Sequence, residues 1–167
     1  MKKMPAFLAV PLLLISLSGC STKPVCPTPH FAVDTDASVQ CDHAEYQCHI
    51  QYVDQNTASL TFTAPESLAG FSVIRGSGNY SFSLGSLLCK GMCLLPENSP
   101  AVRVFSAFDT LSKAELLCTG QNEDNTFTFV PDQHTDSPIL TCDGSGHLLS
   151  LKTEGTEIRF ALPKSTE

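Results

Sequence analysis

Apolar and polar residues alternate with a period of two over much of the chain after residue 30. In residues 31–41 the side chains from Phe31 to Cys41 at odd positions form one row, and polar residues separate most of them. Residues 46–52 repeat this pattern, with Tyr46 and Tyr52 at the two ends of its row. Such alternation is typical of strands with one buried and one solvated face, and the polar segment 42–45 predicts a hairpin between the two.

The same alternation returns in eight later segments, and turn residues lie between most of them. Short glycine-containing segments stand at 76–78 (GSG), 143–146 (DGSG) and 154–155 (EG), where tight turns are expected. Consecutive hairpins favour an antiparallel meander. The predicted strands cover residues 59–64, 71–75, 79–87, 115–119, 126–130, 139–143, 147–152 and 157–162.

Residues 98–111 break the strand pattern. Their apolar positions follow helical spacing, Pro100 suits the first helical position, and Ser99 is the expected N-cap. The stripe comprises Ala101, Val104, Phe105, Phe108 and Leu111. We therefore predict a mainly β (α+β) fold, a curved antiparallel sheet or incomplete β-barrel of about ten strands, with one main amphipathic helix packed on its concave face.

The N-terminus has the layout of a secretory signal. Lys2 and Lys3 precede an uncharged apolar run at 4–17, which is shorter than the roughly 20 residues of a membrane span. The sequence Leu17-Ser18-Gly19-Cys20 resembles the lipobox of bacterial lipoproteins. This resemblance implies cleavage before Cys20 and attachment of palmitate-type acyl chains there. An ordinary signal peptide with a chance cysteine is the alternative.

These features divide the chain into four parts. We expect a lipoprotein signal peptide at 1–19, a lipidated cysteine and proline-rich tether at 20–30, one β-rich domain at 31–163 and a C-terminal tail at 164–167. The predicted location is the extracytoplasmic face of a cell membrane, with the lipid anchor as the membrane contact. Stable anchoring by acyl chains requires more than one chain, at about 0.8 kcal/mol per buried methylene.

Charge argues against nucleic acid as a partner. Ten basic residues face 17 acidic ones, a net charge of −7 that becomes −9 when Lys2 and Lys3 are removed with the signal peptide. Nucleic-acid phosphates repel such a surface.

The arrangement resembles the lipoprotein-carrier superfamily of LolA, LolB and LppX, in the small form found in Gram-positive anaerobes. The residues that carry the resemblance are the strand, turn and strand at 60–71 (LTFTAPESLAGF), the helix at 100–111, and the closing hairpin at 144–151 and 158–160. In that superfamily a curved sheet capped by helices holds acyl chains. The resemblance implies a hydrophobic ligand pocket lined by Phe62, Phe82, Val104, Phe105 and Phe108. A filled core without a ligand is the alternative, because this chain has fewer helices than those carriers.

Eight cysteines are present, and lipidation of Cys20 would leave seven, so at least one is unpaired. If the first hairpin turns at residues 44–45, Cys41 and Cys48 lie opposite each other at a Cα separation of about 4.5 Å, which suits a disulfide. If the turn lies at residues 42–43, the register shifts and the two sulfurs separate. We favour the Cys41–Cys48 disulfide.

The other cysteines support no specific chemistry. Cys89 and Cys93 are separated by three residues, whereas redox and zinc motifs have two. A bond between them, or from either to Cys118, stays open. Cys118 and Cys142 also fit strand rows as small apolar side chains.

We find no pattern that predicts catalysis, a metal or a cofactor. The acidic and histidine positions at Asp132, His134 and Asp136 lie in a polar turn, where solvation explains them. No Gly-x-Ser-x-Gly elbow or phosphate-binding loop occurs. The chain is therefore interpreted as a non-enzymatic lipoprotein that binds a lipid or other hydrophobic ligand. A structural or protein-interaction lipoprotein with a filled core is the alternative.

Overall fold

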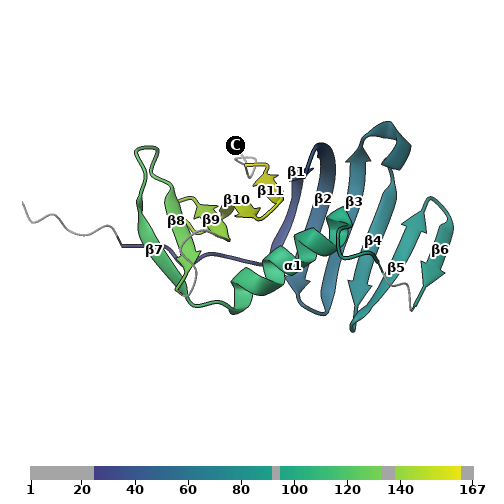
Figure 1. The fold of residues 1–167 in the computed structure, drawn as a ribbon, viewed down its shortest axis with the longest axis horizontal. Helices are drawn as coiled ribbons and strands as arrows, with labels where there is room; N and C mark the ends of the chain where they lie inside the picture. The colour runs from purple at the N-terminus through teal and green to yellow at the C-terminus, as the bar shows by residue number, and fades with distance from the viewer. Residues whose placement is uncertain (1–24, 92–94, 133–137, 163–167) are drawn as a thin grey trace, which may run out of the picture.

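A computed structural model describes residues 25–91, 95–132 and 138–162. Eleven antiparallel strands form one open, curved sheet, and one helix, α1 (Pro100–Lys113), crosses it (Figure 1). The strands are β1 (Val33–Cys41), β2 (Ala44–Asp54), β3 (Thr57–Ala64), β4 (Phe71–Gly76), β5 (Asn79–Leu84), β6 (Leu87–Lys90), β7 (Leu116–Gln121), β8 (Phe127–Pro131), β9 (Ile139–Cys142), β10 (Leu148–Thr153) and β11 (Thr156–Phe160). A short 3-10 turn, η1 (Glu66–Leu68), joins β3 to β4. The predicted fold class is confirmed.

The strand order places the two halves of the chain side by side. It runs β6-β5-β4-β3-β2-β1-β11-β10-β9-β8-β7, so the first and last strands pair at the centre of the sheet. Each half is a meander of hairpins, and α1 is the connection between the halves. Consequently β6 and β7 are the two edges, and they lie at opposite ends of the molecule (Figure 1).

Helix α1 begins and ends close to the predicted positions. Ser99 is its N-cap residue and Pro100 its first residue, as the sequence indicated. Its apolar stripe packs on the concave face of the sheet, where Phe108 stacks on Tyr52 with ring centroids 4.5 Å apart. Six helix residues are buried there, namely Ala101, Val104, Phe105, Ala107, Phe108 and Leu111.

A buried ion pair also joins α1 to the sheet. The Arg75 side chain from β4 is 8% exposed, and its Nη1 and Nη2 donate to the two carboxylate oxygens of Asp109 at 2.7 and 3.0 Å. Tyr52 Oη donates to the same carboxylate at 2.9 Å, and the guanidinium lies 4.9 Å from the ring centroid of Phe105. Because a buried charge is costly without a partner, this pair favours one position of the helix on the sheet.

The first hairpin turns at residues 42–43, not at residues 44–45. Cys41 pairs with Ala44 and Cys48 pairs with Ala37, so the two sulfurs are not opposite each other, and both thiols are buried and free. Asp42 adopts a positive φ of 52°, which a short polar residue tolerates, and this permits the two-residue turn. The predicted Cys41–Cys48 disulfide is therefore wrong.

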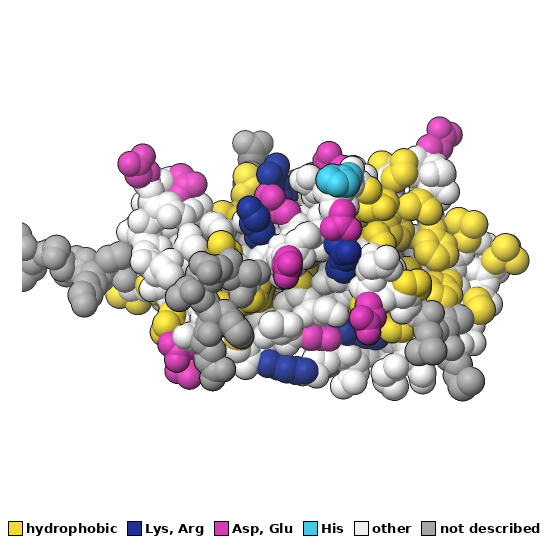
Figure 2. All heavy atoms as spheres, viewed as in Figure 1, with side chains coloured by type: hydrophobic (Ala, Val, Ile, Leu, Met, Phe, Trp, Pro, Cys, Tyr) yellow, Lys and Arg dark blue, Asp and Glu magenta, His cyan; other side chains and the backbone are white. Residues whose placement is uncertain are grey.

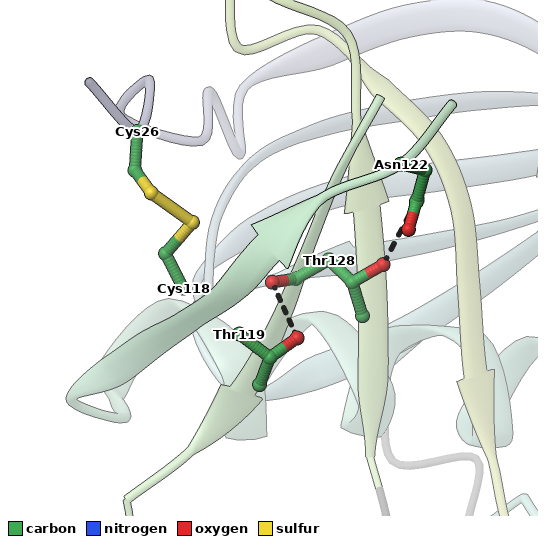
Figure 3. The surroundings of a disulfide bond; sticks show 5 residues. All are labelled: Cys26, Cys118, Thr119, Asn122 and Thr128. Atoms are coloured by element: carbon green, nitrogen blue, oxygen red, sulfur yellow. Dashed lines mark hydrogen bonds between the residues drawn. A yellow bond between two sulfur atoms is a disulfide. The ribbon is translucent and has the colours of Figure 1, made fainter. Parts of the chain in front are cut away.

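The structure instead contains a disulfide between Cys26 and Cys118 (Figure 3). It joins the segment before β1 to edge strand β7, across 92 positions of sequence. A backbone hydrogen bond from His30 N to Gly146 O, 2.9 Å long, holds the same segment at the β9–β10 turn. The proline-rich segment is thus attached to the sheet from Cys26 onward.

The predicted strand at 79–87 is divided in two. Gly85, with a φ of 57°, begins a two-residue turn, and the chain returns as β6, with Leu84 paired to Leu87. A glycine at the first turn position suits a type II′ hairpin. The apolar leucines on both sides of the turn hid this break in the sequence pattern.

Among the described residues, no helix is long and apolar enough to cross a membrane.

Candidate hydrophobic-ligand site

The five residues predicted to line a pocket do not form one together. Val104, Phe105 and Phe108 are 0% exposed and Phe62 is 4% exposed, so these four belong to the core. Phe82 is partly buried and lines a surface cavity. The helix face is packed against the sheet because its aromatic side chains fill the concavity that they were expected to border.

An apolar surface lies beyond the helix, at the β4–β6 end of the same concave face. Tyr46, Phe62, Phe71 and Phe82 come from four neighbouring strands, β2 to β5, and we call these residues the aromatic row. Successive ring centroids in this row are 5.5, 6.2 and 5.8 Å apart. These separations are those of favourable aromatic contacts. Three of the four rings, all except Phe62, are only partly buried.

Two leucines extend the aromatic row to the edge of the sheet. Leu84 and Leu87 face each other across the β5–β6 turn and are 50% and 72% exposed. Figure 2 displays apolar side chains gathered at this end of the molecule. A shallow cavity of about 320 Å³ lies here, lined by Phe71, Phe82, Ser83, Leu84, Leu87, Leu88 and Cys89.

The surroundings of this surface carry little charge. Residues 71–90 contain no Asp or Glu, and their two charged residues are Arg75 and Lys90. Arg75 is buried in its pair with Asp109, which leaves Lys90 as the exposed charge of the three strands. A partly exposed apolar surface with few charges can remove alkyl or aromatic groups of a ligand from water.

A second and larger cavity, lined by both apolar and polar side chains, lies near the N-terminal end of β1. It measures about 560 Å³, and its lining includes His30, His49 and His147. His49 Nδ1 lies 2.9 Å from Asp36 and its Nε2 lies 2.8 Å from Asp34, as expected for a side chain that points away from Cys48. The hydrogen bond to Asp36, aided by Asp34, raises the pKa of His49 against the opposing effect of burial. Both ring nitrogens are engaged, so His49 is a poor candidate for a general base.

The described residues include no group of three or more His, Cys, Asp or Glu that could hold a metal ion. Of the turn residues considered for metal binding, His134 and Asp136 lie outside the described residues, as do Cys20 and Cys93. Burial raises the pKa of the Cys48 and Cys142 thiols to about 12 in each case. Thiols of this kind are weak nucleophiles at neutral pH.

Sequence reasoning found part of this site. The alternation placed Tyr46, Phe62 and Phe82 on buried rows, yet it did not separate the rings under the helix from those beyond it. Coverage by α1 decides which rings are exposed, and strand periodicity does not report the position of a helix in space. The exposed Leu87 of β6 was missed because that strand was not predicted.

Comparison with known proteins assigns no family. No family model matches the sequence, and no curated protein matches it. Among solved structures, the crystal structure of a LolA superfamily protein from Nitrosomonas europaea is similar, with a TM-score of 0.40 and 10% sequence identity over 77% of this chain and 83% of that chain. A similarity of this strength is too weak to assign a family or a function.

Proposed function

We propose that this chain is an extracytoplasmic lipoprotein, anchored to a membrane through Cys20, that binds the apolar part of a ligand on the aromatic row. A lipid acyl chain is the ligand class that fits best. One observation carries the binding proposal: the aromatic row and its two leucines offer a continuous, partly exposed apolar surface, and residues 71–90 beside it contain no acidic residue.

The size of the surface indicates what would be bound. The cavity of about 320 Å³ lies at the lower end of the range for small-molecule sites. Each methylene removed from water contributes about 0.8 kcal/mol, so several methylenes are needed before the cost of association is offset. A single acyl chain, held over part of its length, matches these limits.

Two features support the location. The lipobox-like sequence at 17–20 follows an uncharged apolar run. The Cys26–Cys118 disulfide belongs to the chemistry of oxidising compartments outside the cytoplasm. The small lipoproteins of Gram-positive anaerobes are the group of proteins in which we would place the chain.

Binding is tested by titrating the protein with a fluorescent fatty-acid analogue. The wild-type protein should bind the analogue, and Phe82→Ser should weaken binding about tenfold, the equivalent of about 1.4 kcal/mol. Val53→Ser is the matched control, because Val53 is 57% exposed and outside the aromatic row. Equal affinity in the wild type and both variants would refute binding at this surface.

Anchoring is tested separately by expressing the full chain and its Cys20→Ser variant in a bacterial host. We expect the wild-type protein in the membrane fraction, with an intact mass that includes acyl chains. The variant should lack these chains. An unmodified wild-type mass would remove the anchor from the proposal and leave ligand binding untouched.

A protein-interaction lipoprotein without a small ligand is the competing function. The packed helix face favours it, because Val104, Phe105 and Phe108 leave no exposed surface under α1. Absence of fatty-acid binding together with capture of a specific protein by the wild type, lost in Leu87→Ser, would select this alternative.

A further inference from the structure

The two edges of the sheet differ in how well they are protected. Edge strand β7 is linked to Cys26 by a disulfide, and its pairing with β8 contains an irregularity between Cys118 and Gly120. Edge strand β6 pairs with β5 in regular register, has no proline, and all four of its residues are exposed. Exposed regular edges with apolar side chains readily accept another strand, and most proteins block them.

The β5–β6 turn determines which backbone groups of β6 are available. In a two-residue hairpin the residues that flank the turn, here Leu84 and Leu87, form a hydrogen-bonded pair. Residues alternate along an antiparallel strand between bonding to one neighbour and facing away from it. The N–H and C=O groups of Leu88 and Lys90 therefore point away from β5, toward the side of β6 on which no described strand pairs with it.

We propose that β6 pairs with β6 of a second copy of this chain, antiparallel and about a two-fold axis at Leu88. In this register Leu88 lies opposite the partner's Leu88, and Lys90 lies opposite the partner's Ser86. The register uses the outward groups of the whole strand, and isologous contacts of this kind close as dimers.

Charge favours a second copy at this position. The chain carries a net charge of −7, which opposes association through most of its surface, but residues 71–90 contain no acidic residue. Lys90 is the exposed charge of the edge, and the register places it away from the partner's Lys90. The copies thus meet where like charges are fewest.

Apolar area supplies the remaining attraction. Leu87 and Leu88 are 72% and 52% exposed. Two apolar side chains per copy are fewer than a standard interface of about 800 Å² per partner contains. We therefore expect a reversible dimer, strengthened when a membrane anchor concentrates the copies.

The dimer would change the proposed binding surface, and this step rests on the proposed function. Leu84 and Leu87 end the apolar surface of one copy at the edge where the partner would begin. Pairing brings the two cavities together across the axis. A chain longer than one cavity of about 320 Å³ would then contact both copies.

Sedimentation velocity of the full chain in density-matched detergent tests the dimer. The wild-type protein should shift from monomer toward dimer as its concentration rises. Leu88→Lys should remain monomeric, because two ammonium groups would meet at the axis, and Val53→Lys should dimerise as the wild type does. A wild type that stays monomeric at every concentration, or L88K that dimerises like the wild type, would overturn the proposal.

Two further measurements keep the outcomes distinct. Circular dichroism establishes that L88K is folded, and Leu88→Pro, which removes an outward N–H, should block pairing if L88K is unfolded. A second variant separates the dimer from the proposed function: Lys90→Pro removes an outward N–H at a residue outside the cavity lining, so it should remain monomeric and bind the fatty-acid analogue with wild-type affinity. Vesicle binding by an always monomeric Cys20→Ser chain, which lacks the acyl anchor, would assign the edge to a membrane and refute the dimer.

Discussion

At the scale of single residues, buried thiols provide the first prediction. Cys48 and Cys142 are 1% and 0% exposed, and burial raises the pKa of each to about 12. We expect both to resist a water-soluble disulfide reagent at pH 8 in the folded protein and to react once denaturant is added. Mass spectrometry of the labelled peptides checks this. Fast labelling of either residue in the folded protein would contradict the core described above.

The ion pair between Arg75 and Asp109 provides the second. Asp109→Ala would leave the 8% exposed guanidinium without its carboxylate, and we expect a loss of about 3 kcal/mol in the free energy of unfolding. Arg75→Met with Asp109→Leu should cost less than the single change, since both charges are removed. Urea denaturation measures both effects. A single variant as stable as the wild type would show that the pair does not hold the helix.

His49 provides a pH-dependent prediction. Its pKa in the folded protein is raised by Asp36 first and Asp34 next, above an unfolded value of about 6.5. The stabilisation is therefore fully present below pH of about 6.5 and is lost as pH rises through the folded value. An NMR titration of the His49 ring should yield a pKa above that of an unfolded peptide, and Asp36→Asn should lower it. An unchanged value in that variant would refute the assignment.

The sequence pattern predicted some side-chain contacts and not others. The alternation along the second strand predicted that the side chains of His49 and Cys48 lie on opposite faces of the sheet. The structure confirms this, because His49 pairs with Asp36 on the solvated face. The disulfide partner of Cys118 could not be predicted, because Cys26 lies in a segment without periodicity. The position of such a segment on the sheet depends on tertiary contacts, which local sequence patterns do not report.

At the scale of elements, the helix was predictable because its signals agree. Pro100, Ser99 and the apolar stripe all indicate one start and one buried face. The first hairpin was ambiguous, because the four residues 42–45 permit two turns, and the positive φ of Asp42 decided between them. Strand β6 was hidden, because Leu84 and Leu87 continue an apolar pattern through Gly85.

The disulfide provides the prediction at this scale. It closes a loop of 92 positions, and bonds that close long loops stabilise proteins by about 2–4 kcal/mol. We expect Cys26→Ser with Cys118→Ser to lower the thermal midpoint, and the midpoint of that variant should not respond to a reductant. Calorimetry with and without reductant measures this. Equal midpoints for the wild type in the two conditions would contradict the bond.

At the scale of the whole molecule, the fold class followed from the sequence and the strand order did not. Ten alternating segments and one helix are enough to predict a curved sheet with a covered face. The central β1–β11 pairing joins residues more than a hundred positions apart, as in Val39 with Ile158. Local patterns carry no signal for such contacts.

The candidate site shows the same division. Buried rows were predicted correctly, but apolar side chains that face a helix and those that face solvent have the same spacing. The predicted pocket therefore included four residues that are packed in the core, and the exposed surface lies beside them, along Phe71, Phe82 and Leu84. Apolar side chains that α1 covers belong to the core, and those that it does not cover form the exposed surface.

Native mass spectrometry tests the central claim, ligand binding on the aromatic row, most directly. Protein purified gently from its own host should carry an apolar adduct of lipid mass, and incubation with a fatty acid should restore that adduct after its removal. Phe71→Ser with Phe82→Ser should lose the adduct while Val53→Ser retains it. Wild-type protein that carries no adduct in either preparation, or a double variant that carries the same adduct as the wild type, would contradict the account.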